Sequence, residues 1–172
     1  DAYGDTALFI AVNSCRIEIV RILLEYKAAV NTPNPNSPVI ARAAHCEGFD
    51  WGNASAMAKL LIAHGADVNL QRTDTGETAL DIAAGWGDVD TIALLIAHGA
   101  RVNSARKDGV TPLMTGAVFG RLQAVRLLLQ HGADVHARTL QGETALIMVA
   151  RKSVIPRIMD PFHQDDLLIL RD

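Results

Sequence analysis

The side chains of this sequence best suited to bind a metal or act as nucleophiles are its six histidines and two cysteines. Cys46 directly follows His45, and Cys15 could join them in a thiolate–imidazole cluster. A zinc site, however, needs four closely spaced ligands, and the sequence has no Cys-x-x-Cys. We therefore predict no metal and no cofactor, and we expect two buried, inert thiols.

Motifs that would support catalysis are also absent from the sequence. It has no Gly-x-Gly-x-x-Gly or phosphate-binding loop, and no Gly-x-Ser-x-Gly nucleophile elbow. The carboxylates are spread along the chain instead of being paired in a pocket-forming motif. Because no combination of nucleophile, base and oxyanion donor can be assembled, we predict that the protein is not an enzyme.

Composition narrows the class of protein further. Of the 172 residues, 49% are hydrophobic and 20% are charged, which is typical of an ordered globular chain. The net charge of −3 argues against a nucleic-acid partner, since such domains usually carry a basic excess. No apolar run is long enough to cross a bilayer, so we predict no membrane insertion.

Location is inferred from the cysteines and the first residues. Two cysteines cannot form a disulfide framework, so an oxidising compartment is not demanded. The chain shows no signal-peptide pattern, and we predict a cytoplasmic protein, with a secreted effector as the alternative. It begins at Asp1 without Met, which suggests a piece of a longer protein.

Two short blocks recur at a fixed spacing. The form Gly-x-Thr-x-Leu starts at Gly4, Gly76, Gly109 and Gly142, and the last three glycines are 33 residues apart. The second block, Leu-Leu-Ile-Ala-His-Gly-Ala-Asp-Val-Asn, occupies residues 60–69. It recurs at 94–103, at 127–136 and, in a weaker copy with Lys27 in place of glycine, at 22–31. A regular period of this length indicates a repeat architecture.

The order and spacing of these blocks resemble the ankyrin-repeat family over nearly the whole chain. The resemblance implies an all-α solenoid of stacked helix-turn-helix units with hairpin-like loops. We expect a single ankyrin-repeat domain over residues 1–172, with five units at about 1–33, 34–70, 71–105, 106–138 and 139–172.

Within one unit, local chemistry predicts where the helices begin and end. The threonine of the first block should cap the first helix, and Pro112 stands where a first-turn proline is tolerated. The glycine of the second block should end the second helix in the left-handed conformation. The recurring His64, His98 and His131 lie in the last turn of that helix, where a histidine faces the helix dipole favourably. We interpret them as structural.

The second and fifth units depart from the pattern. In the second, three prolines precede a short predicted helix from Val39 to about His45, and a lengthened loop at about 46–53 precedes a helix from about Ala54 to Ala63. Phe49 and Trp51 in this loop either bind a partner or fold back over the core.

In the fifth unit, residues 145–150 match a first helix, and prolines interrupt the expected second one. Asp165 to Arg171 could form a displaced helix that caps the solenoid; alternatively, another repeat follows.

A partner surface is expected along the loop tips and the exposed face of the first helices, as the resemblance implies. Trp86 and Phe119 are 33 residues apart, so they should lie side by side in an apolar patch, unless they merely cover the seam between units. Charges at the rim should steer a partner. The predicted partner-binding residues are Tyr3, Phe49, Trp51, Asp74, Glu77, Ile82, Trp86, Lys107, Val118, Phe119, Met148, Arg151 and Lys152.

The resulting functional prediction is a non-catalytic protein–protein interaction module that binds a protein or peptide in its concave groove. By resemblance it would act as an adaptor, an inhibitor or an effector, and we expect a monomer. One alternative is the targeting segment of a larger enzyme or channel. Another is a substrate of asparagine hydroxylases, with Asn31, Asn69 and Asn103 as the modified residues.

Overall fold

The computed structural model describes residues 6–31, 38–46 and 52–154. Within these ranges the chain forms nine α-helices and no strand, as the predicted all-α class requires. The helices are α1 (Ala7–Asn13), α2 (Ile17–Glu25), α3 (Val39–Ala43), α4 (Gly52–Ala63), α5 (Ala79–Trp86), α6 (Val89–Ala97), α7 (Pro112–Val118), α8 (Leu122–Gln130) and α9 (Ala145–Val154).

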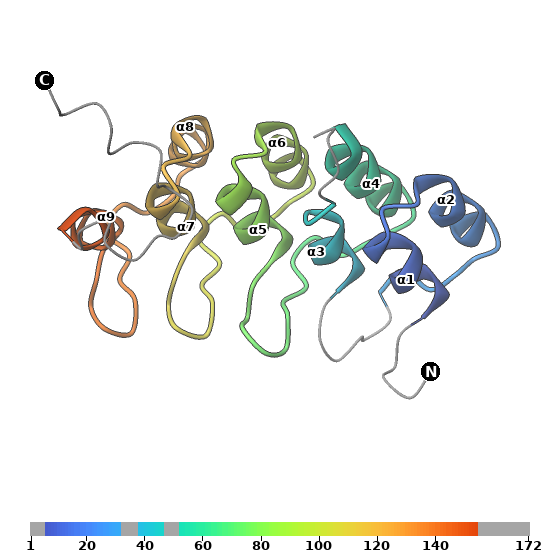
Figure 1. Cartoon of the computed structure of the whole chain (residues 1–172), viewed down its shortest axis with the longest axis horizontal. Helices are drawn as coiled ribbons and strands as arrows, with labels where there is room; N and C mark the ends of the chain where they lie inside the picture. Colours follow the sequence, from blue (N-terminus) through green and yellow to red (C-terminus); the bar gives the residue numbers. More distant parts are fainter. Residues whose placement is uncertain (1–5, 32–37, 47–51, 155–172) are drawn as a thin grey trace, which may run out of the picture.

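Two rows of helices make up the solenoid (Figure 1). The odd-numbered helices α1 to α9 form one row, in which each helix packs on the next, and α2, α4, α6 and α8 form the second row in the same way. Long loops project from the row of odd-numbered helices (Figure 1). We number the helix pairs as units one to four, and α9 with its preceding loop as unit five.

Predicted caps begin the first helices. The hydroxyl oxygens of Thr6, Thr78 and Thr111 accept hydrogen bonds from the backbone N–H three residues on, at 3.1, 3.2 and 3.4 Å. Pro112 is the first residue of α7, where its missing N–H has no intrahelical partner to lose. The threonine caps therefore fix the start of each of these helices, and Pro112 reinforces it in α7.

Left-handed residues end the second helices, as predicted. Gly65, Gly99 and Gly132 have φ of 85°, 85° and 84°, and Lys27 adopts φ of 60° at the same place in unit one. In this conformation their N–H groups bond back to the last turn, which satisfies carbonyls that would otherwise be unpaired.

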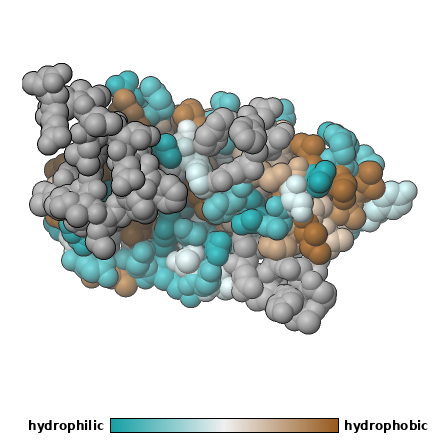
Figure 2. Space-filling view, in the orientation of Figure 1, coloured by the Kyte–Doolittle hydropathy of each residue, from teal (hydrophilic) through white to brown (hydrophobic). Residues whose placement is uncertain are grey.

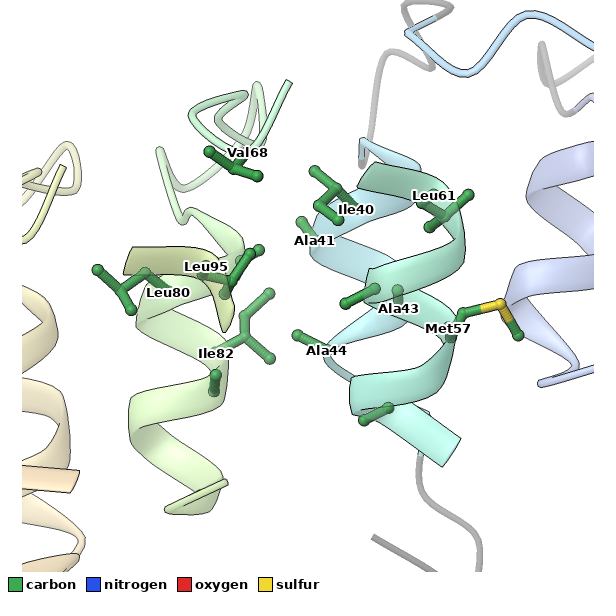
Figure 3. Close-up of a cluster of buried hydrophobic side chains, with 14 of the residues drawn as sticks. Ile40, Ala41, Ala43, Ala44, Met57, Leu61, Val68, Leu80, Ile82 and Leu95 are labelled. Carbon is green, nitrogen blue, oxygen red and sulfur yellow. The ribbon is translucent and has the colours of Figure 1, made fainter. Parts of the chain in front are cut away.

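Small and large apolar residues alternate across the core between the units. Leu61, Leu80 and Leu95 are almost completely buried, and the row of odd-numbered helices carries alanines where neighbouring helices meet. Figure 3 shows Ile82 of α5 directed towards Ala44 of α3 across one such seam. Because the alanines are small, helices can approach closely and their larger neighbours fill the space.

The departures of units two and five are partly as predicted. Helix α3 ends two residues earlier than expected, at Ala43, and α4 begins two residues earlier, at Gly52. The predicted long loop therefore loses its last residues to α4, while Phe49 and Trp51 lie outside the described residues. Helix α9 continues beyond the predicted match to Val154, and the expected cap at 165–171 also lies outside the description.

Cys15 and Cys46 form a disulfide that joins unit one to unit two, with their Cα atoms 5.5 Å apart. The prediction of inert thiols is therefore wrong, and the thiolate–imidazole alternative falls with it, since neither sulfur is free. Register explains the bond. Cys15 has the left-handed conformation of Gly87, its counterpart in unit three, and Cys46 of unit two corresponds to Arg121 of unit four. A Cβ on Gly87 would lie 3.3 Å from Cβ of Arg121, so the repeat brings these two positions of neighbouring units together.

Asparagine side chains link the units beyond the core. The amide of Asn31 donates to Gly65 O (2.8 Å) and its oxygen accepts from Asp67 N (2.9 Å), so both groups bond to the next unit. Asn69 and Asn103 make the same pair of bonds one and two units further on. Each bridge satisfies backbone groups at a helix end that would otherwise depend on water.

Backbone hydrogen bonds also join the tips of neighbouring loops. Lys107 N donates to Thr75 O at 3.0 Å, and Leu140 N donates to Asp108 O at 2.9 Å. The two loops approach so closely that a Cβ on Gly109 would lie 2.8 Å from Leu140 N. Glycine is therefore required there both by its φ of 85° and by the contact.

Gly109→Ala should destabilise the protein by about 1–3 kcal/mol, because it combines left-handed strain with a backbone clash. Gly142→Ala is the matched control, since Gly142 has a φ of 77° but no atom within 4 Å of the added Cβ. Urea unfolding followed by circular dichroism would compare them. Equal losses in the two variants would mean that the loop contact contributes nothing.

The disulfide predicts that native protein reacts with no thiol reagent and has an intact mass lower by two hydrogens than the reduced form. Reduction should lower the stability of the first two units by about 2–4 kcal/mol, because it frees the unfolded chain. Cys46→Ala should be insensitive to reductant and serves as the control. Two titratable thiols in freshly purified protein would contradict the bond.

Candidate functional site

A pocket of about 360 Å³ opens beside α5 and α7, and it combines aromatic with charged side chains. Helix α5 supplies one wall, Thr115 of α7 and Phe119 at its C-terminal end a second, and His45, shortly after α3, a third. Its lining residues are His45, Arg72, Glu77, Asp81, Ile82, Gly85, Trp86, Arg106, Thr115, Phe119 and Arg121. Such convergence of polar groups on an apolar hollow is typical of a binding site.

Trp86 and Phe119 both line this pocket, so the two rings that the 33-residue spacing predicts to be neighbours share one site. Phe119 is 56% exposed, whereas Trp86 is half-buried, packs against the core and meets the ring of His45 edge-on at 6.2 Å. Ile82 is only 5% exposed, so its expected place in an exposed patch is wrong. It lines the pocket from the core side.

A chain of ion pairs crosses the same pocket. Arg106 of unit four reaches two carboxylates of unit three, Glu77 at 3.0 Å and Asp81 at 3.5 Å. Glu77 in turn lies 3.6 Å from Arg72, which pairs with Asp74 at 2.8 Å. The Arg72 guanidinium holds the pKa of Asp74 below its usual range. The predicted rim charges Asp74 and Glu77 are therefore paired within the chain.

Asp81 is the most unusual group of the pocket, because its side chain is completely buried. Its Oδ2 accepts from the N–H and the hydroxyl of Thr78 at 2.9 and 2.7 Å, which closes a capping box. Its Oδ1 and Nε of Arg106 make no good hydrogen bond. Burial raises the pKa of Asp81 to about 6 despite the bonds from Thr78 and the charge of Arg106.

The remaining predicted charges mostly have partners of their own. Lys107 donates from Nζ to Thr73 O at 2.6 Å, and Arg151 pairs with Glu143 at 2.9 Å. Lys152 lies over the ring of Phe119, 4.9 Å from its centroid, beside Val118, whose carbonyl it bonds at 3.0 Å. Val118 and Met148 are half-buried, and Tyr3 lies outside the described residues.

The asparagines proposed as modification sites have the structural role described above, since both ends of each amide bond to the next unit. His64 and His98 likewise donate from Nδ1 to the carbonyls of Leu60 and Leu94, at 3.0 and 2.8 Å. This supports the structural interpretation of these two recurring histidines. Among the described residues, no group of three or more possible ligands could hold a metal ion.

Sequence reasoning missed the buried charges. Asp81 stands where the other units place Phe9, Met114 and Ile147, so a carboxylate at an apolar position of the repeat was a readable signal. A buried carboxylate requires a partner, but the sequence alone does not identify Arg106 as that partner.

Other exposed apolar surfaces lie at the two ends of the stack. Ile10, Ile19 and Ile22 of unit one are 50%, 50% and 54% exposed, and Figure 2 shows apolar surface at that end. At the other end a hollow of about 260 Å³ lies under Leu146, which is 78% exposed. Its lining is entirely apolar, so it offers a ligand no orienting group.

Comparison with known proteins decides the family. The sequence model described as "Ankyrin repeats (3 copies)" matches residues 42–139, and that of a single "Ankyrin repeat" matches residues 3–32. The chain belongs to the ankyrin-repeat family. Its members are generally non-catalytic modules for binding other proteins.

Two curated relatives are similar to part of this ankyrin-repeat chain. The nuclear factor NF-kappa-B p105 subunit of Mus musculus is 34% identical over 119 residues, and that of Gallus gallus is 31% identical over 118 residues. Each match covers 68% of this chain but 12% of the relative. No described helix of the chain is both long and apolar enough to pass through a membrane.

Asp81→Asn should remove one pH dependence of stability. Because the folded pKa is about 6 and the usual value 3.8, the folded state binds more protons between these values. Asp81 therefore contributes most to the free energy of unfolding below pH 4. This contribution falls by roughly 2–3 kcal/mol as the pH rises through 6.

Urea unfolding of both proteins at several pH values checks this, and carbon NMR of the Asp81 carboxyl gives its titration directly. The wild type should lose stability relative to Asp81→Asn as the pH rises from 4 to 7. A constant difference over this range would contradict the raised pKa.

Proposed function

We propose that this ankyrin-repeat chain is a non-catalytic module that binds a protein or peptide in a concave groove, with the Trp86–Phe119 pocket as its central contact. The observation that carries the proposal is Phe119, a large ring more than half exposed that lines a pocket together with charged side chains. Aromatic side chains, phenylalanine included, are enriched at protein–protein interfaces.

The framework holds this ring in place. Helices α5 and α7 pack closely beside it, since a Cβ on Gly85 would lie 3.2 Å from Thr115 and 3.8 Å from the ring of Phe119. A site fixed by stacked helices needs little ordering on binding, which favours affinity. The relatives are named as a subunit of a nuclear factor, and a role within an assembly agrees with the proposal.

A monomer in the cytoplasm, with no nucleic-acid partner, is part of the same proposal. The disulfide bears on it, because such bonds persist in oxidising compartments and are usually transient in the cytosol. Trapping free thiols in cells before lysis would test the location. A fully oxidised pair in cells would favour the secreted alternative.

The test of the binding site is selection of binders from a random peptide library displayed on phage. The double variant Trp86→Ala, Phe119→Ala should bind the selected peptides tenfold or more weakly than the wild type, as expected for truncated hot-spot residues. Trp86 fluorescence in a Trp51→Phe background provides a direct titration.

Leu122→Ala is the matched control, because Leu122 is 59% exposed at the start of α8 and does not line the pocket. It should leave affinity unchanged, and circular dichroism should show that all variants fold. Peptides that bind the double variant as well as they bind the wild type would overturn the proposed site.

A further inference from the structure

The chemistry of the preferred ligand can be read from which pocket charges already have partners. Both carboxylates of the pocket already face arginines: Glu77 faces Arg72 and Arg106, one at each carboxylate oxygen. Asp81 accepts from Thr78 at one oxygen and faces Arg106 at the other. A basic ligand would therefore meet carboxylates that are already neutralised by arginines.

Arg121 is the exception among the arginines of the pocket. Its Nε donates to Gly85 O at 2.9 Å, and its aliphatic stem packs over Gly87. Among the described residues no carboxylate lies within ion-pair distance of it, unlike Arg72 and Arg106. Because Gly85 and Arg121 both line the pocket, its guanidinium is fixed there with hydrogen-bond donors to spare.

A second cation without a carboxylate partner among the described residues lies on α9. Lys152 of α9 sits over the ring of Phe119 and bonds the carbonyl of Val118. Its neighbour Arg151 pairs with Glu143, whereas the described residues provide no carboxylate for Lys152. Lys152 of unit five thus covers the ring of Phe119, and Arg121 of unit four lines the same pocket as that ring. Neither cation faces a carboxylate of the described residues.

We propose that the pocket binds an acidic side chain of the partner, with its carboxylate on Arg121 and the adjoining apolar residue against Trp86 and Phe119. This inference rests on the proposed function and names the chemistry that the site selects. A planar guanidinium matches a carboxylate with two parallel hydrogen bonds. Lys152 adds attraction at longer range, where a rim charge speeds association.

The geometry also explains why an uncharged ligand would bind less well. An amide in place of the carboxylate would present an N–H to a guanidinium that can only donate. The aromatic rings would still be covered, so the apolar part of the affinity would remain. Acid preference and aromatic contact are therefore separable, and they depend on different residues.

The experiment uses the same displayed random library on wild type and on Arg121→Gln. Glutamine keeps an aliphatic stem and an amide donor for Gly85 O but removes the charge. Peptides selected by the wild type should be enriched in Asp or Glu beside a Leu, Phe or Trp, and Arg121→Gln should lose this enrichment. In the selected peptides, Glu→Gln should weaken binding to the wild type by roughly tenfold and to the variant hardly at all.

Arg121→Lys separates charge from structure, because it restores the cation without the planar fork, and it should recover part of the acid preference. Lys152→Gln should slow association and reduce its salt dependence. Selection of basic or neutral peptides that still require Trp86 would overturn the acidic preference and leave the proposed function standing. Acidic peptides indifferent to Trp86→Ala and Phe119→Ala would overturn both.

Discussion

Burial between neighbouring units is the constraint on which the rest of this structure depends. A pair of helices as short as α1 and α2 cannot hide its own apolar face, so each unit is stable only because the next one covers it. The alanines of the odd-numbered row bring the helices close, the asparagine bridges join each helix end to the next unit, and backbone bonds link the loop tips. The pocket of the candidate site lies across such a seam, where Arg106 of unit four reaches Glu77 and Asp81 of unit three.

The pocket uses the seam in a way that opposes stability. Where other units place Phe9 or Met114, unit three buries the carboxylate of Asp81. In the described part of the chain, Arg106 of the next unit is the one cation within ion-pair distance of it. Leaving a buried ion imperfectly bonded is unfavourable, and the raised pKa of Asp81 is the measure of that penalty. A framework with many apolar contacts tolerates it, and the result is a polar wall beside the exposed ring of Phe119 and the half-buried ring of Trp86.

Much of this could be predicted from one sequence. The period gave the helix pairs, because the Thr caps and the left-handed glycines act within a few residues of each other. What failed involved side chains of different units. The disulfide and the Asp81–Arg106 pair depend on which residue of one unit faces which residue of the next, and the period alone does not supply that register. The rings of Trp86 and Phe119 were predicted to be neighbours because they share one repeat position, but the burial of half of the Trp86 side chain was not predicted.

Solenoids are commonly thought to grow by duplication, with whole units added or deleted like links in a chain. The ion pair from Arg106 to Glu77 and Asp81 makes such exchange unequal along this chain. A unit inserted between units three and four would leave a buried carboxylate facing an apolar neighbour, while insertion beyond unit four would disturb no buried charge among the described residues. We therefore expect units three and four to be gained or lost together.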